Sequence, residues 1–168
     1  MTSHLILGGA RSGKSRYAQT LAEAFDGDLI FIATGEAFDD EMAERIAHHR
    51  ADRGPRWDTV EAPLALDEAI RARAAPGKLL LIDCLTLWVS NLMHAERDIV
   101  AATDELIAAM GDARGPVILV ANEVGLGIVP DNALARRFRD EAGRVNQAVA
   151  AAANEVSFIA AGLPLRLK

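Results

Sequence analysis

An eight-residue glycine-rich segment limits the possible folds of this chain more than any other feature. Residues 8–15 read GGARSGKS and match the pattern G-x-x-x-x-G-K-[ST] of a phosphate-binding loop (P-loop). In such a loop the backbone N–H groups point inward around the phosphates, the lysine brings a positive charge to the β- and γ-phosphates, and the serine hydroxyl binds Mg²⁺. The segment therefore predicts that the chain binds a nucleoside triphosphate, provided that a strand precedes it and a helix follows it.

The sequence on either side of the loop meets this condition. Residues 4–7 (HLIL) form a short apolar run that is typical of a buried parallel strand. Apolar residues then recur at helical spacing from Tyr17 to Phe25, before the segment DGD at 26–28 interrupts the pattern. Because strand, glycine loop and helix follow in the required order, we expect Lys14 to be catalytic and Ser15 to bind the metal.

Length and composition narrow the possibilities further. A chain of 168 residues corresponds to one domain, 1–168, and its hydrophobic share of 51% is enough for a core. Cys84 is the only cysteine, which excludes an intrachain disulfide and a thiolate metal cluster. No apolar run reaches the ~18 residues of a membrane span and the chain enters a strand at once, so we expect no signal peptide and a cytoplasmic location. The net charge of −6 argues against nucleic acid as a partner.

The rest of the chain alternates between strand-like and helix-like segments. Strands are expected at residues 29–33, 79–83, 116–121 and 156–160, with a short one after Gly162 and either a strand or an extended segment at 57–61. Helices are expected at residues 39–53, 64–70, 86–93, 98–113 and 133–149, the last capped by Asp131 and Asn132 and carrying Leu134 on its apolar face. This alternation predicts the α/β class, as a P-loop nucleoside-triphosphatase-like three-layer sandwich with a mostly parallel central sheet.

Asp83 ends one of these expected strands. Four aliphatic residues followed by an aspartate are typical of the strand whose carboxylate lies beside the bound Mg²⁺ in P-loop proteins. The alternative is that Asp83 caps the helix expected at 86–93. We favour the metal role, because a P-loop already implies a cation that must be held.

The segment NEVGLGIVP at 122–130 leaves the edge at which parallel sheets bind ligands. It combines two glycines with three apolar residues, Leu126, Ile128 and Val129. Two interpretations are open: a mobile apolar loop, or a long loop that folds back onto the core.

Several segments of the chain together resemble one enzyme family. They are GGARSGKS, IATG, RIAHHRADRGPRW, VEAP, LLLIDCLT, NEVGLGIVP and RDEAGRVNQ, in this order. The combination is similar to the adenosylcobinamide kinase/adenosylcobinamide-phosphate guanylyltransferase family of cobalamin biosynthesis. The resemblance covers essentially the whole chain and is far more specific than the P-loop alone.

The resemblance implies two reactions on one polypeptide. First, the terminal phosphoryl group of ATP or GTP is transferred to the hydroxyl of the aminopropanol arm of adenosylcobinamide. Second, a histidine attacks the α-phosphorus of GTP, pyrophosphate leaves, and GMP passes from the histidine to the new phosphate to give adenosyl-GDP-cobinamide. A homotrimer is also implied, and Mg²⁺ is the expected cofactor. The preferred phosphoryl donor, and whether both reactions share one nucleotide site, stay open.

The resemblance also implies which residues contact nucleotide or metal. The P-loop contributes Gly8, Gly9, Ala10, Arg11, Ser12, Gly13, Lys14 and Ser15. The remaining positions are Ala33, Thr34, Gly35, Arg50, Ala51, Asp52, Arg53, Glu61 and Asp83, with Ser15 and Asp83 as metal ligands. Some relatives have glutamate where this strand ends in Asp83, and either carboxylate can serve a metal.

Two adjacent histidines are candidates for the nucleophile. Residues three or four apart share a helix face, so His49 lies with the apolar Ile46, whereas His48 lies with the charged Arg45 and Asp52. A nucleophilic histidine must be held against the nucleotide with a neutral ring. The apolar face favours His49, as does the family pattern H-R-x-x-R, which would place two arginines near the leaving phosphates. The alternative is that His49 is a half-buried structural histidine.

Two other functions are compatible with the P-loop alone. In a simple small-molecule kinase, His49 would be structural only. A nucleotide-dependent switch would need N-K-x-D after a late strand, but here that strand leads into NEV at 122–124. A D-x-x-G match at 112–115 precedes its strand instead of following it. We therefore favour the bifunctional enzyme over both.

Overall fold

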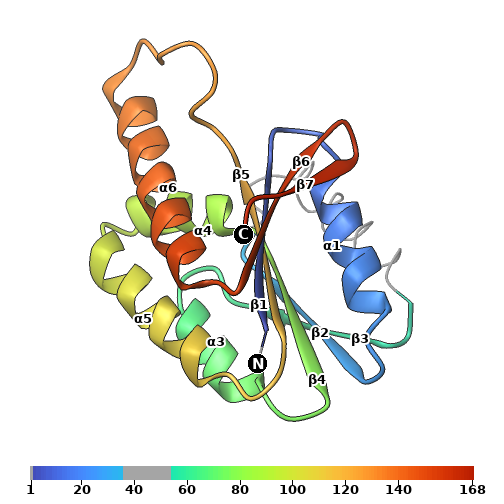
Figure 1. Ribbon diagram of the computed structural model, residues 1–168. Helices are drawn as coiled ribbons and strands as arrows, with labels where there is room; N and C mark the ends of the chain where they lie inside the picture. Colours follow the sequence, from blue (N-terminus) through green and yellow to red (C-terminus); the bar gives the residue numbers. More distant parts are fainter. Residues whose placement is uncertain (1, 36–53) are drawn as a thin grey trace.

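A seven-stranded sheet forms the centre of the molecule in the computed structural model, which describes residues 2–35 and 54–168 (Figure 1). The strands are β1 (Ser3–Gly8), β2 (Asp28–Ala33), β3 (Trp57–Glu61), β4 (Lys78–Asp83), β5 (Val117–Asn122), β6 (Glu155–Ala160) and β7 (Leu163–Arg166). Their order in the sheet is β3-β2-β4-β5-β1-β6-β7. All neighbours are parallel except β6 and β7. The predicted mostly parallel sheet is therefore confirmed.

Helices cover both faces of this sheet, which gives the predicted three layers (Figure 1). The described helices are α1 (Lys14–Glu23), α3 (Leu66–Arg73), α4 (Leu85–His94), α5 (Ile99–Asp112) and α6 (Ala133–Ala152). Leu5 and Ile6 are neighbours in β1 and both are fully buried, but they belong to different halves of the core. Ile6 packs on the side of α1, with Ala18 and Ala22, whereas Leu5 packs on the side of α3 to α6. Burial on both faces explains why the strands are almost continuously apolar.

Three expectations left open by the sequence are decided by the fold. Residues 57–61 form a true strand, β3, which pairs with β2. The residue that caps α4 is Cys84, whose sulfur accepts the N–H of Leu87 at 3.5 Å, so the alternative role of Asp83 as a cap is wrong. The loop at 122–130 does not fold back onto the core, because Leu126 and Ile128 are 83% and 97% exposed.

The start of α6 differs from the prediction in two details. Asn132 alone provides the side-chain cap, accepting the N–H of Ala135 at 2.7 Å, and Asp131 has no part in it. Leu134 was expected on the buried face but is 61% exposed. The first turn of α6, which includes Leu134, adjoins the loop after β5 at the end of the helix (Figure 1). The helix expected at 39–53 lies outside the described residues.

No helix in the described ranges combines the length and the apolar composition that spanning a membrane requires.

Candidate active site

The P-loop connects the end of β1 to the start of α1. Gly13 ends the loop with a φ of 95°, a conformation that favours glycine. Gly8 begins it in a tight space, since a Cβ there would lie 2.5 Å from the Ser12 hydroxyl oxygen and 2.8 Å from the Ile159 carbonyl oxygen. The Lys14 ammonium donates to the carbonyl of Gly9 at 3.3 Å, so this side chain bends back over its own loop. The glycines of the motif are therefore required by the geometry of the loop.

The first turn of α1 is open to an anion. Gly13, the N-cap residue that precedes the helix, makes no side-chain cap, and no acidic residue lies in the first turn. The free N–H groups and the positive end of the helix dipole therefore point at the space enclosed by the loop. A phosphate group bound there would accept these hydrogen bonds.

The turn between β6 and β7 supports the P-loop from one side. The N–H of Gly162 donates to the carbonyl of Ser12 at 2.8 Å, and a Cβ on Gly13 would lie 3.2 Å from the Gly162 Cα. Sequence analysis identified Gly162 only as a turn before a short strand. Nothing in the local pattern relates it to Ser12, which is far away in the sequence, so this contact was missed.

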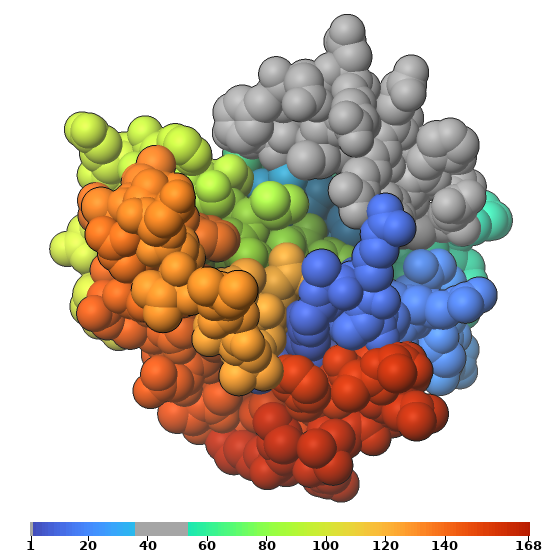
Figure 2. All heavy atoms as spheres, turned by 90° about the horizontal axis from the view of Figure 1, so that it is seen from above, coloured from blue at the N-terminus to red at the C-terminus, as the bar shows by residue number. Residues whose placement is uncertain are grey.

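Three predicted residues meet at the same sheet edge as the P-loop. Ala33 is the register partner of both Asp83 and Glu61. Two residues earlier on the same strands, Phe31 and Leu81 pack on the side of α1. Because side chains alternate along a strand, the side chains at 33, 61 and 83 also point to that side. In the view from above, the surface is hollowed beside the blue P-loop and the orange segment after β5, with green and pale-blue atoms at the floor (Figure 2).

Thr34 has a structural role at this edge. It is completely buried, and its hydroxyl donates to the carbonyl of Cys84 at 2.7 Å and accepts the N–H of Cys84 at 2.8 Å. Its own carbonyl accepts from the side-chain amide of Asn91 at 2.7 Å. The Thr34 side chain therefore holds the ends of β2 and β4 together, and its hydroxyl is not available to a ligand.

Asn91 is a buried residue that sequence analysis missed. Its amide nitrogen donates to the carbonyl of Thr34 and also to the carbonyl of Pro63, at 3.0 Å. Trp88, one turn earlier on α4, donates its indole N–H to the carbonyl of Leu64 at 2.9 Å. Together these bonds tie the chain after β2 and after β3 to α4. An asparagine inside an apolar helical pattern was the available signal.

The possible metal ligands at this edge are oxygen atoms. Ser15 in the first turn of α1 and Asp83 at the end of β4 provide a hydroxyl and a carboxylate, which suit Mg²⁺. Among the described residues no three His, Cys, Asp or Glu side chains are grouped as a metal cage. Mg²⁺ is usually held by one or two protein ligands together with waters and substrate phosphates, so the residues present fit this ion. Burial raises the pKa of the Cys84 thiol to about 11, which removes it as a thiolate ligand or nucleophile.

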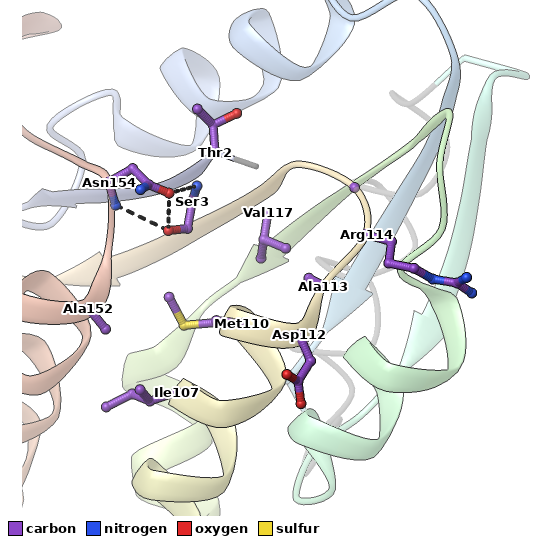
Figure 3. Close-up of a pocket in the computed structure, with 12 residues that line it drawn as sticks. Thr2, Ser3, Ile107, Met110, Asp112, Ala113, Arg114, Val117, Ala152 and Asn154 are labelled. Carbon is purple, nitrogen blue, oxygen red and sulfur yellow. Dashed lines mark hydrogen bonds between the residues drawn. The ribbon is translucent and has the colours of Figure 1, made fainter.

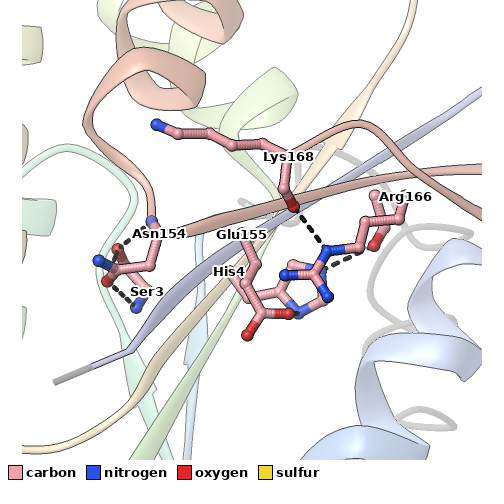
Figure 4. Close-up of polar contacts among 7 residues, drawn as sticks. Ser3, His4, Asn154, Glu155, Arg166 and Lys168 are labelled. Atoms are coloured by element: carbon pink, nitrogen blue, oxygen red, sulfur yellow. Dashed lines mark hydrogen bonds and ion pairs between the residues drawn. The ribbon is translucent and has the colours of Figure 1, made fainter.

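His4 lies in a polar cluster that is separate from this edge (Figure 4). Its Nε2 is 2.9 Å from the Ser157 hydroxyl, and its Nδ1 is 4.0 Å from the Glu155 carboxylate. Burial lowers the pKa of His4, and the nearby Arg166 lowers it further, although Glu155 opposes both effects. The cluster lies near the amino end of β1, and the P-loop begins where this strand ends.

A concave pocket lies at the opposite edge of the sheet (Figure 3). It is lined by residues at the start of β1 and the ends of α5 and α6, including Ser3, Met110, Arg114 and Asn154. None of the predicted site residues lines it. Ligands of open parallel sheets bind at the carboxyl ends of the strands, so the P-loop edge is the candidate active site.

The candidate site therefore contains most of the predicted residues. The P-loop residues 8–15, Ala33, Gly35, Glu61 and Asp83 all lie at the carboxyl edge of the sheet. The predicted residues His49, Arg50, Ala51, Asp52 and Arg53 lie outside the described part of the chain.

Comparison with known proteins shows which family shares these features. Residues 4–167 match the sequence model of a family described as cobinamide kinase / cobinamide phosphate guanyltransferase. The chain is 48% identical over 166 residues to the bifunctional adenosylcobalamin biosynthesis protein CobP of Pseudomonas aeruginosa, covering 98% of this chain and 96% of that protein. It is 45% identical to the bifunctional adenosylcobalamin biosynthesis protein CobU of Escherichia coli, covering 98% of each.

A solved structure of similar fold is the crystal structure of the RadB recombinase. It aligns with a TM-score of 0.54 over 94% of this chain and 73% of that one. At 14% sequence identity this likeness concerns the fold alone.

The structural role of Thr34 can be tested by replacing it with valine. Thr34→Val keeps the shape but leaves the buried N–H of Cys84 without an acceptor, which should cost about 1–3 kcal/mol in the free energy of unfolding. Urea denaturation measures this cost. The control is Thr103→Val, at a threonine of similar burial whose hydroxyl donates to the helical carbonyl of Ile99. Its cost should be smaller, and equal losses in the two variants would contradict the assigned role of Thr34.

Proposed function

The chain belongs to the cobinamide kinase / cobinamide phosphate guanyltransferase family, and from this premise we propose which of its residues act in each of the two reactions. It is a bifunctional enzyme of adenosylcobalamin biosynthesis that acts as a cobinamide kinase and as a guanylyltransferase. In the proposal, ATP or GTP phosphorylates the aminopropanol hydroxyl of adenosylcobinamide. GMP from a second nucleotide is then attached to the new phosphate, which gives adenosyl-GDP-cobinamide.

The P-loop carries the kinase reaction in this proposal. The observation that supports it most is the loop geometry: an uncapped α1 N-terminus beside Lys14, whose ammonium contacts the loop carbonyl of Gly9. On nucleotide binding the backbone N–H groups and Lys14 would hold the β- and γ-phosphates. These donors stabilise the negative charge on the transferring phosphoryl group, which is the main catalytic effect in reactions of this type.

Ser15 and Asp83 would hold Mg²⁺. When bound, this ion supplies positive charge that neutralises the phosphate oxygens and orients the nucleotide. Asp83 is half-buried and its side chain points to the same side of the sheet as the P-loop, which supports this role. Ser15 lies in the first turn of α1, directly after Lys14.

His49 carries GMP between the two substrates in the guanylyltransferase reaction. Its ring nitrogen attacks the α-phosphorus of GTP, the bond to pyrophosphate breaks, and a phosphate oxygen of adenosylcobinamide phosphate then displaces the histidine. Arg50 and Arg53 are assigned to bind the phosphates of GTP that leave as pyrophosphate. One described feature supports this arrangement: β2 ends at the site edge, and Gly35 follows it there immediately before the segment that carries His49.

The corrinoid lies against the apolar loop in this proposal. This loop, which we define as residues 124–129, follows β5 at the site edge and exposes Leu126, Ile128 and Val129. A corrinoid is much larger than a nucleotide and has apolar surface that needs contact. The exposed apolar side chains of this loop, which begins directly after the residue bonded to Gly8, can supply that contact.

Two further properties complete the proposal. The family resemblance implies a homotrimer. A cytoplasmic location follows from the proposed substrates, since ATP and GTP are supplied there.

Lys14→Ala should strongly reduce cobinamide phosphorylation, because it removes the fixed charge beside the transferring group. Interactions of this kind contribute roughly 3–4 kcal/mol, so we expect a loss of about 10²–10³-fold or more in kcat. The control is Lys78→Ala, at a lysine on the opposite edge of the sheet that forms an ion pair with the exposed Asp28 at 3.9 Å. If folded Lys14→Ala protein phosphorylates cobinamide with a normal kcat, the assignment of the kinase reaction to the P-loop is wrong.

Replacing both Leu126 and Ile128 with serine should weaken corrinoid binding more than nucleotide binding. We expect a rise in the KM for adenosylcobinamide with little change in the KM for GTP, measured under steady-state conditions. Val100→Ser is the matched control, since this valine is 65% exposed, lies in the first turn of α5 and is not part of the apolar loop. Equal increases in both KM values would show that the loop only shapes the site.

His49→Ala should separate the two activities. The variant should still phosphorylate adenosylcobinamide, because that reaction needs no protein nucleophile, but should form neither guanylylated enzyme nor adenosyl-GDP-cobinamide. Incubation with labelled GTP followed by gel analysis detects the adduct, which should be acid-labile and base-stable as a phosphorus–nitrogen bond.

His48→Ala is the matched control for this experiment and should keep much of both activities. Adduct formation that persists in His49→Ala but is lost in His48→Ala would identify His48 as the nucleophile and contradict the assignment of His49. A wild-type protein that forms no adduct would leave only the kinase activity, with His49 as a structural residue.

A further inference from the structure

The sheet order places one residue between the two predicted parts of the kinase site. β5 lies between β4, which carries Asp83, and β1, which carries the P-loop. The first residue after β5 is Glu123, and its backbone N–H donates to the carbonyl of Gly8 at 3.0 Å. Glu123 is therefore fixed to the first residue of the P-loop, at the same edge as Asp83.

The Glu123 side chain is held in turn by the apolar loop. Its Oε1 accepts the N–H of Gly125 at 2.6 Å, and within residues 2–35 and 54–168 this is the only hydrogen bond or ion pair of the Glu123 side chain. A Cβ on Gly125 would lie 2.9 Å from the same oxygen, so this glycine allows the close approach. Residue 123 as a whole is half-buried, its bond to Gly125 is exposed, and it lies where the P-loop strand and the apolar loop meet.

The two substrates of the kinase reaction must meet at this same point. The terminal phosphate of the nucleotide is held by the P-loop, and the corrinoid, on the proposal above, lies against residues 124–129. The alcohol that receives the phosphoryl group must therefore reach from the apolar loop to the P-loop. Glu123 connects these two segments of the chain.

We propose that Glu123 is the general base of the kinase reaction, an assignment that rests on the proposed function. As the alcohol oxygen forms its bond to the terminal phosphorus, its proton passes to the Glu123 carboxylate. The bond between that phosphorus and the oxygen of the leaving nucleoside diphosphate breaks at the same time. The neighbouring groups cannot accept this proton as readily, because the amide of Asn122 is not basic, the ammonium of Lys14 is protonated, and Asp83 is assigned to the metal.

Two substitutions at position 123 separate a chemical role from a structural one. Glu123→Gln keeps an oxygen that can accept the N–H of Gly125 but removes the basic carboxylate, whereas Glu123→Ala removes both. General bases contribute about 10²–10⁴-fold. Both variants should therefore lose about that factor in the kcat for adenosylcobinamide phosphorylation. Glu105→Gln, at an exposed position of α5, is the matched control.

The second reaction provides an internal check on the same variants. Glu123→Gln should form guanylylated enzyme from GTP, and should convert supplied adenosylcobinamide phosphate, at rates close to those of the wild type. If Glu123→Gln phosphorylates adenosylcobinamide normally and only Glu123→Ala loses this activity, the role of Glu123 is structural, through its hydrogen bond to Gly125. Equal losses in phosphorylation and in guanylylation would mean that it shapes the nucleotide site, and both results overturn the assignment. Failure of the wild type to phosphorylate adenosylcobinamide would instead overturn the proposed function itself.

Discussion

The pairing of β1 on both sides is the constraint on which the rest of the site depends. The last residue of this strand, Gly8, is the register partner of Asn122 on one side and of Ile159 on the other. Beyond the strand, the N–H of Glu123 bonds to the carbonyl of Gly8 and the N–H of Gly162 bonds to the carbonyl of Ser12. The P-loop is thus held by the segments that follow both neighbouring strands. A loop fixed in this way can present its N–H groups to phosphates without first becoming ordered, which lowers the cost of binding.

Alternation of side chains along the strands separates chemistry from support at the same edge. The side chains at 33, 61 and 83 point to the face of α1, where the P-loop lies. The buried hydroxyl of Thr34 bonds instead to the backbone of Cys84, and the Thr34 carbonyl accepts from the Asn91 side chain. Adjacent residues therefore have different roles: one set can contact a nucleotide, and the other holds the strand ends in place. The hydrogen bonds of Thr34 matter because an unpaired buried polar group costs about 1–3 kcal/mol.

Local patterns were sufficient where a single segment sets the structure. The GGARSGKS motif predicted the strand, loop and helix around it, and the aliphatic run before Asp83 predicted a strand that ends at the ligand edge. Predictions were less accurate where two neighbouring residues could serve the same purpose. Both Asp131 and Asn132 are good cap residues, but only Asn132 has the backbone position from which its oxygen reaches the N–H of Ala135. The exposure of Leu134 was missed because periodicity shows which residues share a face and not where the core ends.

The sequence by itself therefore determined most of the described elements, their alternation and the residues at the ends of the strands, whereas β3 was decided by its pairing with β2. Only the tertiary structure decided which of these ends are neighbours. β5 follows β4 in the chain but lies between β4 and β1 in the sheet, and this order brings Glu123 to Gly8. In the same way the turn after β6 brings Gly162 to Ser12. The physical reason is that strand order and register result from packing all the helices on both faces of the sheet at once. No local sequence pattern records contacts between residues so far apart in the chain.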